Sequence, residues 1–336
     1  MYEAFYGLKE RPFELVPNPR FLFLTPRQRE ALSNLQYGLT TSRGLTLLIG
    51  EAGTGKTTLV QAALSDPSAS TVKVVLMSNP TLTRSEFYEF LASAFGLTEA
   101  AAESKTRFLF ELKRELQERF QAGTLSALVI DEAQSIPYEL LEEIRLLSNI
   151  ETTTTKLLNV ILAGQPELSD RLNDTSLRQL KQRISLRCQL NPMELNETAS
   201  YIAGRIRIAG GRPELVFTRE AVGAVFHASG GLPRTVNVIA DNALIGGFAA
   251  QVKPITAAFV EDVCRDFDIN ANPAGSPAPS PSLSDQEAVA EAPPERAPFV
   301  SAPTVPAVAT GEAPALESSI TPMFGSISRK RRFSFF

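Results

Sequence analysis

Residues 50–57 read Gly50-Glu51-Ala52-Gly53-Thr54-Gly55-Lys56-Thr57. This octapeptide fits the pattern G-x-x-x-x-G-K-[ST], in which glycines let the backbone curl until several N–H groups face one anion. An apolar run over residues 45–49 precedes it, and a helical pattern over residues 57–64 follows. Because strand, loop and helix start follow one another in the required order, the stretch predicts a phosphate-binding loop.

The pattern assigns separate tasks to the side chains of this loop. Lys56 is expected to reach the β- and γ-phosphates of ATP, and the hydroxyl of Thr57 to ligate Mg²⁺. The residues expected to surround the nucleotide are Gly50, Glu51, Ala52, Gly53, Thr54, Gly55, Lys56, Thr57 and Thr58.

A second motif ends another apolar run, at residues 125–130, with two carboxylates. Asp131 is predicted to hold Mg²⁺ opposite Thr57. Glu132 follows it directly, and a carboxylate in that position can serve as general base for an attacking water. Beside a complete phosphate loop, the pair therefore predicts nucleotide hydrolysis rather than a strand that simply ends at polar residues.

Two further polar residues are candidates to complete the site. Gln165 follows an apolar run at residues 157–163 and is proposed to orient the water, whereas Asn159 comes several residues too early. Arg234, at a predicted helix start after Gly231, is proposed to reach back to the nucleotide. A helix-capping or turn role for Gln165, and a capping turn with a solvated Arg234, remain alternatives.

Three arginines lie near the start of the last apolar run: Arg178, Arg183 and Arg187. An arginine at this edge can enter a neighbouring subunit's site and stabilise charge on the transferred phosphoryl group. Arg183 is favoured because it stands at the beginning of the run, with an ordinary surface arginine as the alternative. The single histidine, His227, is expected to be a partly buried or surface residue rather than a catalytic one.

The spacing of apolar runs predicts an α/β domain followed by helices. Strands are expected at residues 45–49, 72–77, 125–130, 157–163 and 184–190, with helices between them, which indicates a parallel sheet covered on both faces. Later helices are expected at about 194–209, 218–229, 233–249 and 256–266. The expected segments are 1–44 leading into the core, a nucleotide-binding core at 45–191, a helical lid at 192–268, and a tail at 269–336.

Composition narrows the function classes. The formal net charge is −4, which disfavours a chain-wide nucleic-acid surface, and two distant cysteines argue against a disulfide scaffold or a zinc site. The tail holds 11 of the 23 prolines and ends in a basic and aromatic run at 329–336, so it is expected to be disordered. That end is expected either to be solvated or to touch a membrane surface or a partner. The sequence has neither a secretory signal nor a transmembrane pattern, so a cytoplasmic location is expected, with peripheral inner-membrane contact left open.

Together these motifs resemble the ExeA-like (general secretion pathway protein A) branch of the AAA+ ATPases. The resemblance covers about residues 1–268. It is carried by Tyr2, Phe5-Tyr6-Gly7-Leu8, Pro12-Phe13, residues 50–58, Asp131-Glu132-Ala133-Gln134, Gly164-Gln165-Pro166-Glu167-Leu168, Gln182-Arg183-Ile184 and Gly231-Leu232-Pro233-Arg234.

By that resemblance, residues 50–58 are Walker A and Asp131 with Glu132 are Walker B. Gln165 looks like sensor 1, Arg183 like the arginine finger and Arg234 like sensor 2. The secretion members typically continue into a transmembrane helix and a peptidoglycan-binding domain, whereas an Ala/Pro-rich tail follows here.

The resemblance implies a homo-oligomeric ATPase that assembles or remodels a bacterial envelope complex for secretion, pili or polysaccharide export. A DNA-binding ATPase of transposition type and a nucleotide-dependent binding switch are the alternatives. A helicase is least favoured, because a second motor domain is missing.

Overall fold

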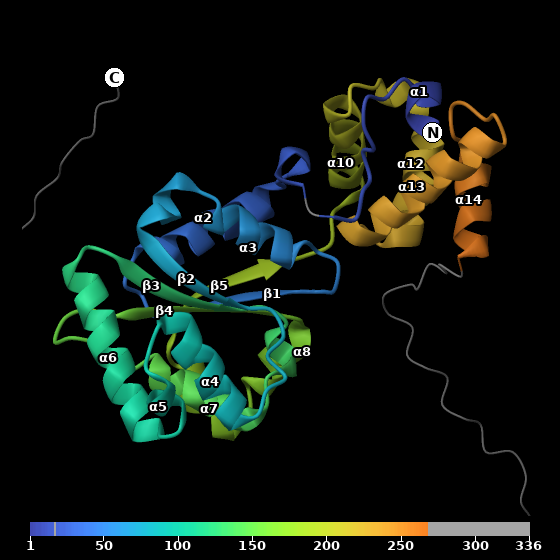
Figure 1. Ribbon diagram of the computed structural model, residues 1–336. Helices are drawn as coiled ribbons and strands as arrows, with labels where there is room; N and C mark the ends of the chain where they lie inside the picture. The colour runs from blue at the N-terminus through green and yellow to red at the C-terminus, as the bar shows by residue number, and fades with distance from the viewer. Residues whose placement is uncertain (17, 268–336) are drawn as a thin grey trace, which may run out of the picture. The chain divides into compact units, whose positions relative to one another are not determined.

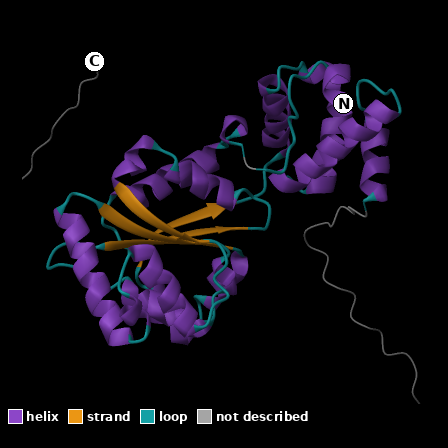
Figure 2. Cartoon of the chain, viewed as in Figure 1, coloured by secondary structure: helices purple, strands orange, loops and turns teal. Residues whose placement is uncertain are grey.

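The computed structural model of the chain describes residues 1–16 and 18–267. In this part of the chain, five parallel strands form one sheet in the order β2-β3-β4-β1-β5 (Figures 1 and 2). The strands are β1 (Leu45–Gly50), β2 (Val72–Met77), β3 (Leu125–Ile130), β4 (Leu158–Gly164) and β5 (Ile184–Leu190). The predicted parallel P-loop sheet is thereby confirmed.

Helices cover both faces of this sheet, as Figure 1 shows. Side chains alternate between the two faces: Leu45 and Leu47 pack into one apolar cluster, whereas Leu48 packs into the other. One face carries α2 (Pro26–Thr40) and α3 (Lys56–Leu64), and the other carries α4 (Arg84–Phe95), α5 (Glu99–Ala102), α6 (Lys105–Gln121) and α7 (Tyr138–Leu147). Burial on both faces explains why the central strands are mainly apolar, with one buried polar residue in each: Thr46, Ser126 and Asn159.

The helices after the sheet build an apolar core of their own. They are α10 (Leu195–Ile208), α11 (Pro213–Val216), α12 (Arg219–Ser229), α13 (Pro233–Ala249) and α14 (Ala257–Asp266). We call them the lid.

The N-terminal segment begins in the lid. The Tyr2 and Tyr6 side chains of α1 (Tyr2–Tyr6) are buried in the lid core. The Tyr2 hydroxyl donates to Oδ1 of Asp241 at 2.5 Å, and the Tyr6 hydroxyl donates to the carbonyl of Val252 at 3.0 Å. Residues 1–44 therefore run from the lid to the sheet, rather than only leading into the sheet.

Several short elements carry too few residues for a periodic pattern and were not predicted. They are α1, α5, α11, α8 (Pro166–Arg171), α9 (Arg178–Lys181) and the 3₁₀ turns η1 (Pro19–Phe21), η2 (Pro67–Thr71), η3 (Ala133–Ser135) and η4 (Thr175–Leu177). The tail predicted from residue 269 lies outside the described residues. Within residues 1–16 and 18–267, no helix is long and apolar enough to cross a membrane.

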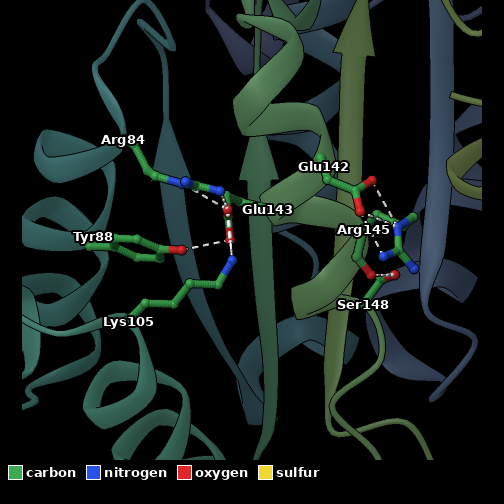
Figure 3. Close-up of polar contacts among 7 residues, drawn as sticks. All are labelled: Arg84, Tyr88, Lys105, Glu142, Glu143, Arg145 and Ser148. Atoms are coloured by element: carbon green, nitrogen blue, oxygen red, sulfur yellow. Dashed lines mark hydrogen bonds and ion pairs between the residues drawn. The ribbon is translucent and has the colours of Figure 1, made fainter. Parts of the chain in front are cut away.

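A buried carboxylate ties three helices together beneath the sheet (Figure 3). The Glu143 side chain on α7 is only 1% exposed. It accepts hydrogen bonds from Tyr88 Oη at 2.6 Å, Lys105 Nζ at 2.8 Å and Arg84 Nε at 2.8 Å. Burial is the largest single influence and raises the pKa of Glu143, but these donors together hold the pKa below its usual value. The ionised form is therefore the one that the fold stabilises.

We expect Glu143→Gln to lower the free energy of unfolding by about 1–3 kcal/mol, because buried charge-assisted hydrogen bonds are lost. Glu142→Gln is the matched control. Glu142 pairs with Arg145 at 2.8 Å but is 46% exposed, so its loss is expected to cost less than about 1 kcal/mol. Urea unfolding measures both.

The difference between wild type and Glu143→Gln has a defined pH dependence. A lowered carboxyl pKa contributes stability above the unfolded-state pKa and loses it as the pH falls through the folded-state value. The difference is therefore full at pH 7 and shrinks below about pH 4. Equal losses in the Glu142 and Glu143 variants, unchanged by pH, would contradict this account.

Candidate nucleotide-binding site

The phosphate loop joins the buried end of β1 to the first turn of α3. Gly53 and Gly55 have φ of +83° and +94°, which side chains with a Cβ rarely adopt. Gly55 is the N-cap of α3, so the free N–H groups of the first helical turn point out of the loop. This arrangement is a ready anion site, as the sequence predicted.

Lys56 is buried within the loop, with 5% of its surface exposed. Its Nζ donates to the carbonyls of Gly50 at 2.8 Å and Glu51 at 3.1 Å. Burial lowers the pKa of Lys56, and the charges of Glu132 and Asp131 act against that shift. The ammonium group thus donates to two neutral carbonyl groups of the loop, and phosphate oxygens can replace these acceptors.

Thr57 and Asp131 contact each other at the carboxyl-terminal ends of the strands. The Thr57 hydroxyl donates to Oδ2 of Asp131 at 2.6 Å, and the Asp131 N–H donates to the carbonyl of Met77 at 2.9 Å. A hydroxyl and one carboxylate are hard oxygen ligands, and Mg²⁺ usually takes one or two carboxylates and completes its shell with water and phosphate. The residues present therefore fit Mg²⁺. No cluster of three His, Cys, Asp or Glu side chains occurs in the described part of the chain, and none is needed for such an ion.

Glu132 lines the same cavity as the phosphate loop. Its φ of 52° and ψ of 37° place it in the left-handed region, which is uncommon for a residue other than glycine and often marks a functional position. Its N–H donates to Oδ1 of Asp131 at 2.9 Å. Its Oε2 accepts a hydrogen bond from Nε2 of Gln134 at 2.6 Å. Sequence reasoning gave no role to Gln134.

Arg234 lies against the phosphate loop, and its contact with a nucleotide stays a prediction. It is the second residue of α13, and its N–H donates to the carbonyl of Gly53 at 3.2 Å. A Cβ at Gly53 would lie 3.1 Å from Cβ of Arg234, so the glycine permits the close approach of the lid. Arg234 lines the cavity together with Lys56 and Glu132.

Apart from Pro233, which stands next to Arg234, the rest of the cavity comes from residues that the sequence did not indicate. Its volume is about 400 Å³, enough for a nucleotide-sized ligand. Away from the phosphate loop it is lined by Glu14, Leu15, Val16, Asn18, Phe21, Leu22, Phe23, Gln28, Met193, Tyr201, Arg205, Pro233 and Asn237. They come from the N-terminal segment, the segment before α10, and the helices α2, α10 and α13. No local motif could have found them, because they meet only through the fold.

Gln165 follows β4, the strand between β1 and β3, as expected for a residue that orients the water. Its backbone N–H donates to Oε1 of Gln134 at 3.0 Å. Gln165 is not among the residues that line the cavity, so its role remains a proposal. Asn159 lies near the start of β4 and donates to the carbonyl of Leu39 at 3.1 Å, far from the loop, as expected.

Arg183 precedes β5 and therefore lies at the amino-terminal ends of the strands, whereas the phosphate loop lies at their carboxyl-terminal ends. β5 pairs with β1 so that Ile184 lies beside Leu45 and Leu190 beside Gly50. At about 3.3 Å per residue, roughly 20 Å of strand separates Arg183 from the phosphate loop. Arg183 therefore cannot serve the nucleotide of its own chain.

The other two arginines lie near the same strand. Arg187, within β5, donates to Ser169 Oγ at 2.7 Å, and Arg178 is exposed at the start of α9. His227 is exposed on α12, away from the cavity lining.

Comparisons with known proteins agree with this geometry. Residues 39–172 match the family model described as AAA domain. The chain is 40% identical over 250 residues to general secretion pathway protein A of Aeromonas hydrophila. The match covers 74% of this chain and 45% of the relative, so the chain spans less than half of that protein.

Solved structures share the fold. Aeropyrum pernix ORC2 in its ADPNP–ADP complexes has a TM-score of 0.56 at 16% identity, covering 77% of this chain and 72% of that one. Cdc6p of Pyrobaculum aerophilum has a TM-score of 0.56 at 16% identity, with coverages of 76% and 70%. Drosophila ORC bound to DNA has a TM-score of 0.55 at 18% identity, with coverages of 76% and 64%. At these identities the likeness establishes the fold alone.

We expect Lys56→Met to weaken ATP binding about 10- to 100-fold, because a charge-assisted hydrogen bond contributes roughly 1.5–3 kcal/mol. Lys73→Met, at an exposed position of β2, is the control and is expected to bind normally. Calorimetry with a non-hydrolysable ATP analogue measures both affinities. Equal affinities would show that Lys56 stays on the loop carbonyls and does not contact phosphate.

Proposed function

Since the chain belongs to the ExeA-like family of AAA+ proteins, we propose that it binds and hydrolyses ATP with Mg²⁺. The observation that carries the proposal is one shared cavity. The phosphate loop with Lys56 and Thr57, the carboxylate of Glu132 and the lid residue Arg234 all line it.

Each of these residues has a task that follows from its position. The N–H groups of the loop and Lys56 bind the phosphates, with Lys56 exchanging loop carbonyls for phosphate oxygens. Thr57 and Asp131 hold Mg²⁺, which neutralises charge on the phosphates when bound. Glu132 accepts a proton from the water that attacks the γ-phosphate. Arg234 stabilises phosphate charge from the lid side.

Arg183 makes the proposed site a shared one. It lies at the amino-terminal ends of the strands, away from the phosphate loop at their carboxyl-terminal ends. Its guanidinium therefore meets a phosphate only in a neighbouring copy of the chain. An arginine supplied in this way stabilises the charge of the transition state. We therefore propose a homo-oligomer in which each copy completes the site of the next.

We propose the task of such an oligomer from its family relationship. General secretion pathway protein A is a secretion protein by its name, so assembly or remodelling of an envelope complex is the function that the relationship favours. A DNA-binding ATPase of transposition type is the second candidate that the sequence left open. The net charge of −4 weighs against that candidate.

We expect Glu132→Gln to reduce kcat about 10²- to 10⁴-fold, the usual contribution of a general base, while ATP binding is retained. Glu139→Gln, at an exposed position in the first turn of α7, is the control and is expected to hydrolyse ATP normally. Phosphate release under saturating ATP and calorimetry measure the two properties. Retained hydrolysis in Glu132→Gln would remove Glu132 from the mechanism.

We expect specific ATPase activity to rise with protein concentration and to fall in Arg183→Ala. Mixing Arg183→Ala with Lys56→Met is expected to raise activity above that of either variant alone, because an intact phosphate loop then meets an intact Arg183 from its neighbour. Arg187→Ala, which loses only the bond to Ser169, is the control. Activity that is independent of concentration, with no recovery on mixing, would indicate a monomeric enzyme and rule out Arg183.

A further inference from the structure

Gln134 connects the carboxylate of Glu132 to the segment that follows β4. Its Nε2 donates to Oε2 of Glu132 at 2.6 Å, and its Oε1 accepts the N–H of Gln165 at 3.0 Å. We propose that Gln134 is a positioning residue, which fixes the Glu132 carboxylate in the orientation needed to accept the proton of the attacking water. The inference rests on the proposed ATP hydrolysis and adds a residue to it.

The amide is the chemical group that this bridge requires. One end must donate to a carboxylate while the other end accepts from a backbone N–H, and a glutamine amide carries both functions. A glutamate at position 134 keeps the acceptor and loses the donor. An apolar residue of similar length loses both.

The chain makes room for this amide at Gly164. A Cβ at Gly164 would lie 3.2 Å from Oε1 and 3.3 Å from the backbone nitrogen of Gln134, and 2.8 Å from Cδ2 of Leu168. These separations are tighter than ordinary van der Waals contacts. The glycine that ends β4 therefore lets the Gln134 side chain lie against the strand end, which explains why glycine precedes Gln165.

Arg171 fixes the backbone on which this side chain stands. Its Nη1 donates to the carbonyl of Gln134 at 2.5 Å and its Nη2 to the carbonyl of Ile136 at 2.6 Å. The same guanidinium lies 4.5 Å from the ring centroid of Tyr138. Arg171 belongs to α8, so backbone and side chain of Gln134 are both attached to the segment after β4.

The geometry also leaves the base free to act. Gln134 contacts one carboxylate oxygen, Oε2, which leaves Oε1 of Glu132 to accept from a water. Glu132 stands in the left-handed region, and its side chain is held there by the hydrogen bond from Gln134. A misplacement of about 1 Å at a reacting group can cost roughly 100-fold in rate, so a fixed orientation has a measurable effect.

The test compares Gln134→Met and Gln134→Glu with wild type. We expect both to lower kcat about 10- to 100-fold, because both lose the donor to Glu132. The dissociation constant of a non-hydrolysable ATP analogue is expected to change less than about 2-fold, because Gln134 does not line the cavity. Gln117→Met is the control, since Gln117 is also partly buried and lies on α6.

A double-mutant cycle separates positioning from a structural role. In the Glu132→Gln background, single-turnover hydrolysis is expected to be unchanged, within about 2-fold, by adding Gln134→Met, because the group that Gln134 orients is already gone. A further fall in that background, or wild-type kcat in both Gln134 variants, would overturn the inference while the proposed function stands. If Gln134→Met does not fold by circular dichroism, Gln134→Glu decides the question.

Failure of the proposed function has a different signature. Wild type and Glu132→Gln would then hydrolyse ATP equally slowly, whatever residue stands at position 134. That result overturns both the proposed function and the inference that rests on it.

Discussion

The hydrogen bond between Thr57 and Asp131 is the contact on which the site depends. These residues follow β1 and β3, which are not neighbours in the sheet, because β4 lies between them. Strands in a parallel sheet end at a common edge, so the chain after β4 must pass close to both motifs. That constraint explains why a glycine occupies position 164 and why Gln165 and Gln134 contact each other beside it.

The parts of the fold that the sequence predicted are those encoded by nearby residues. The runs at 72–77, 125–130 and 184–190 match their strands to the residue, and the long lid helix begins and ends where predicted. The phosphate loop and the pair Asp131 and Glu132 are also local, since backbone conformation and a strand end suffice to place them. Sequence could therefore predict the fold class and name the residues of the proposed site without a structure.

The rest depends on contacts between distant residues, which periodicity does not record. Tyr2 contacts Asp241 in the lid, so the first helix belongs with the last ones. The cavity wall opposite the phosphate loop combines the N-terminal segment with Tyr201, Arg205 and Asn237. Arg205 is buried, donates to the carbonyl of Pro12 at 2.5 Å and to the Tyr201 hydroxyl at 2.8 Å, and so joins that segment to α10.

Because the strands are parallel, the phosphate loop and the carboxylates lie together at the carboxyl-terminal ends of the strands, and Arg183 lies at the amino-terminal ends. In the proposed oligomer, a chain could therefore present either its phosphate loop or its Arg183 to a given neighbour, but it could not bring both to one site. A closed ring or an open helix of copies would resolve this geometry, because each interface would join the Arg183 end of one sheet to the phosphate-loop end of the next. The lid adds a second connection, since the Arg234 N–H is bonded to Gly53 and any rotation of α13 must move the phosphate loop or break that bond. An arrangement in which Arg234 reports on the chain's own nucleotide and Arg183 on the neighbour's would let one site respond to the state of the next, which an assembling ATPase requires.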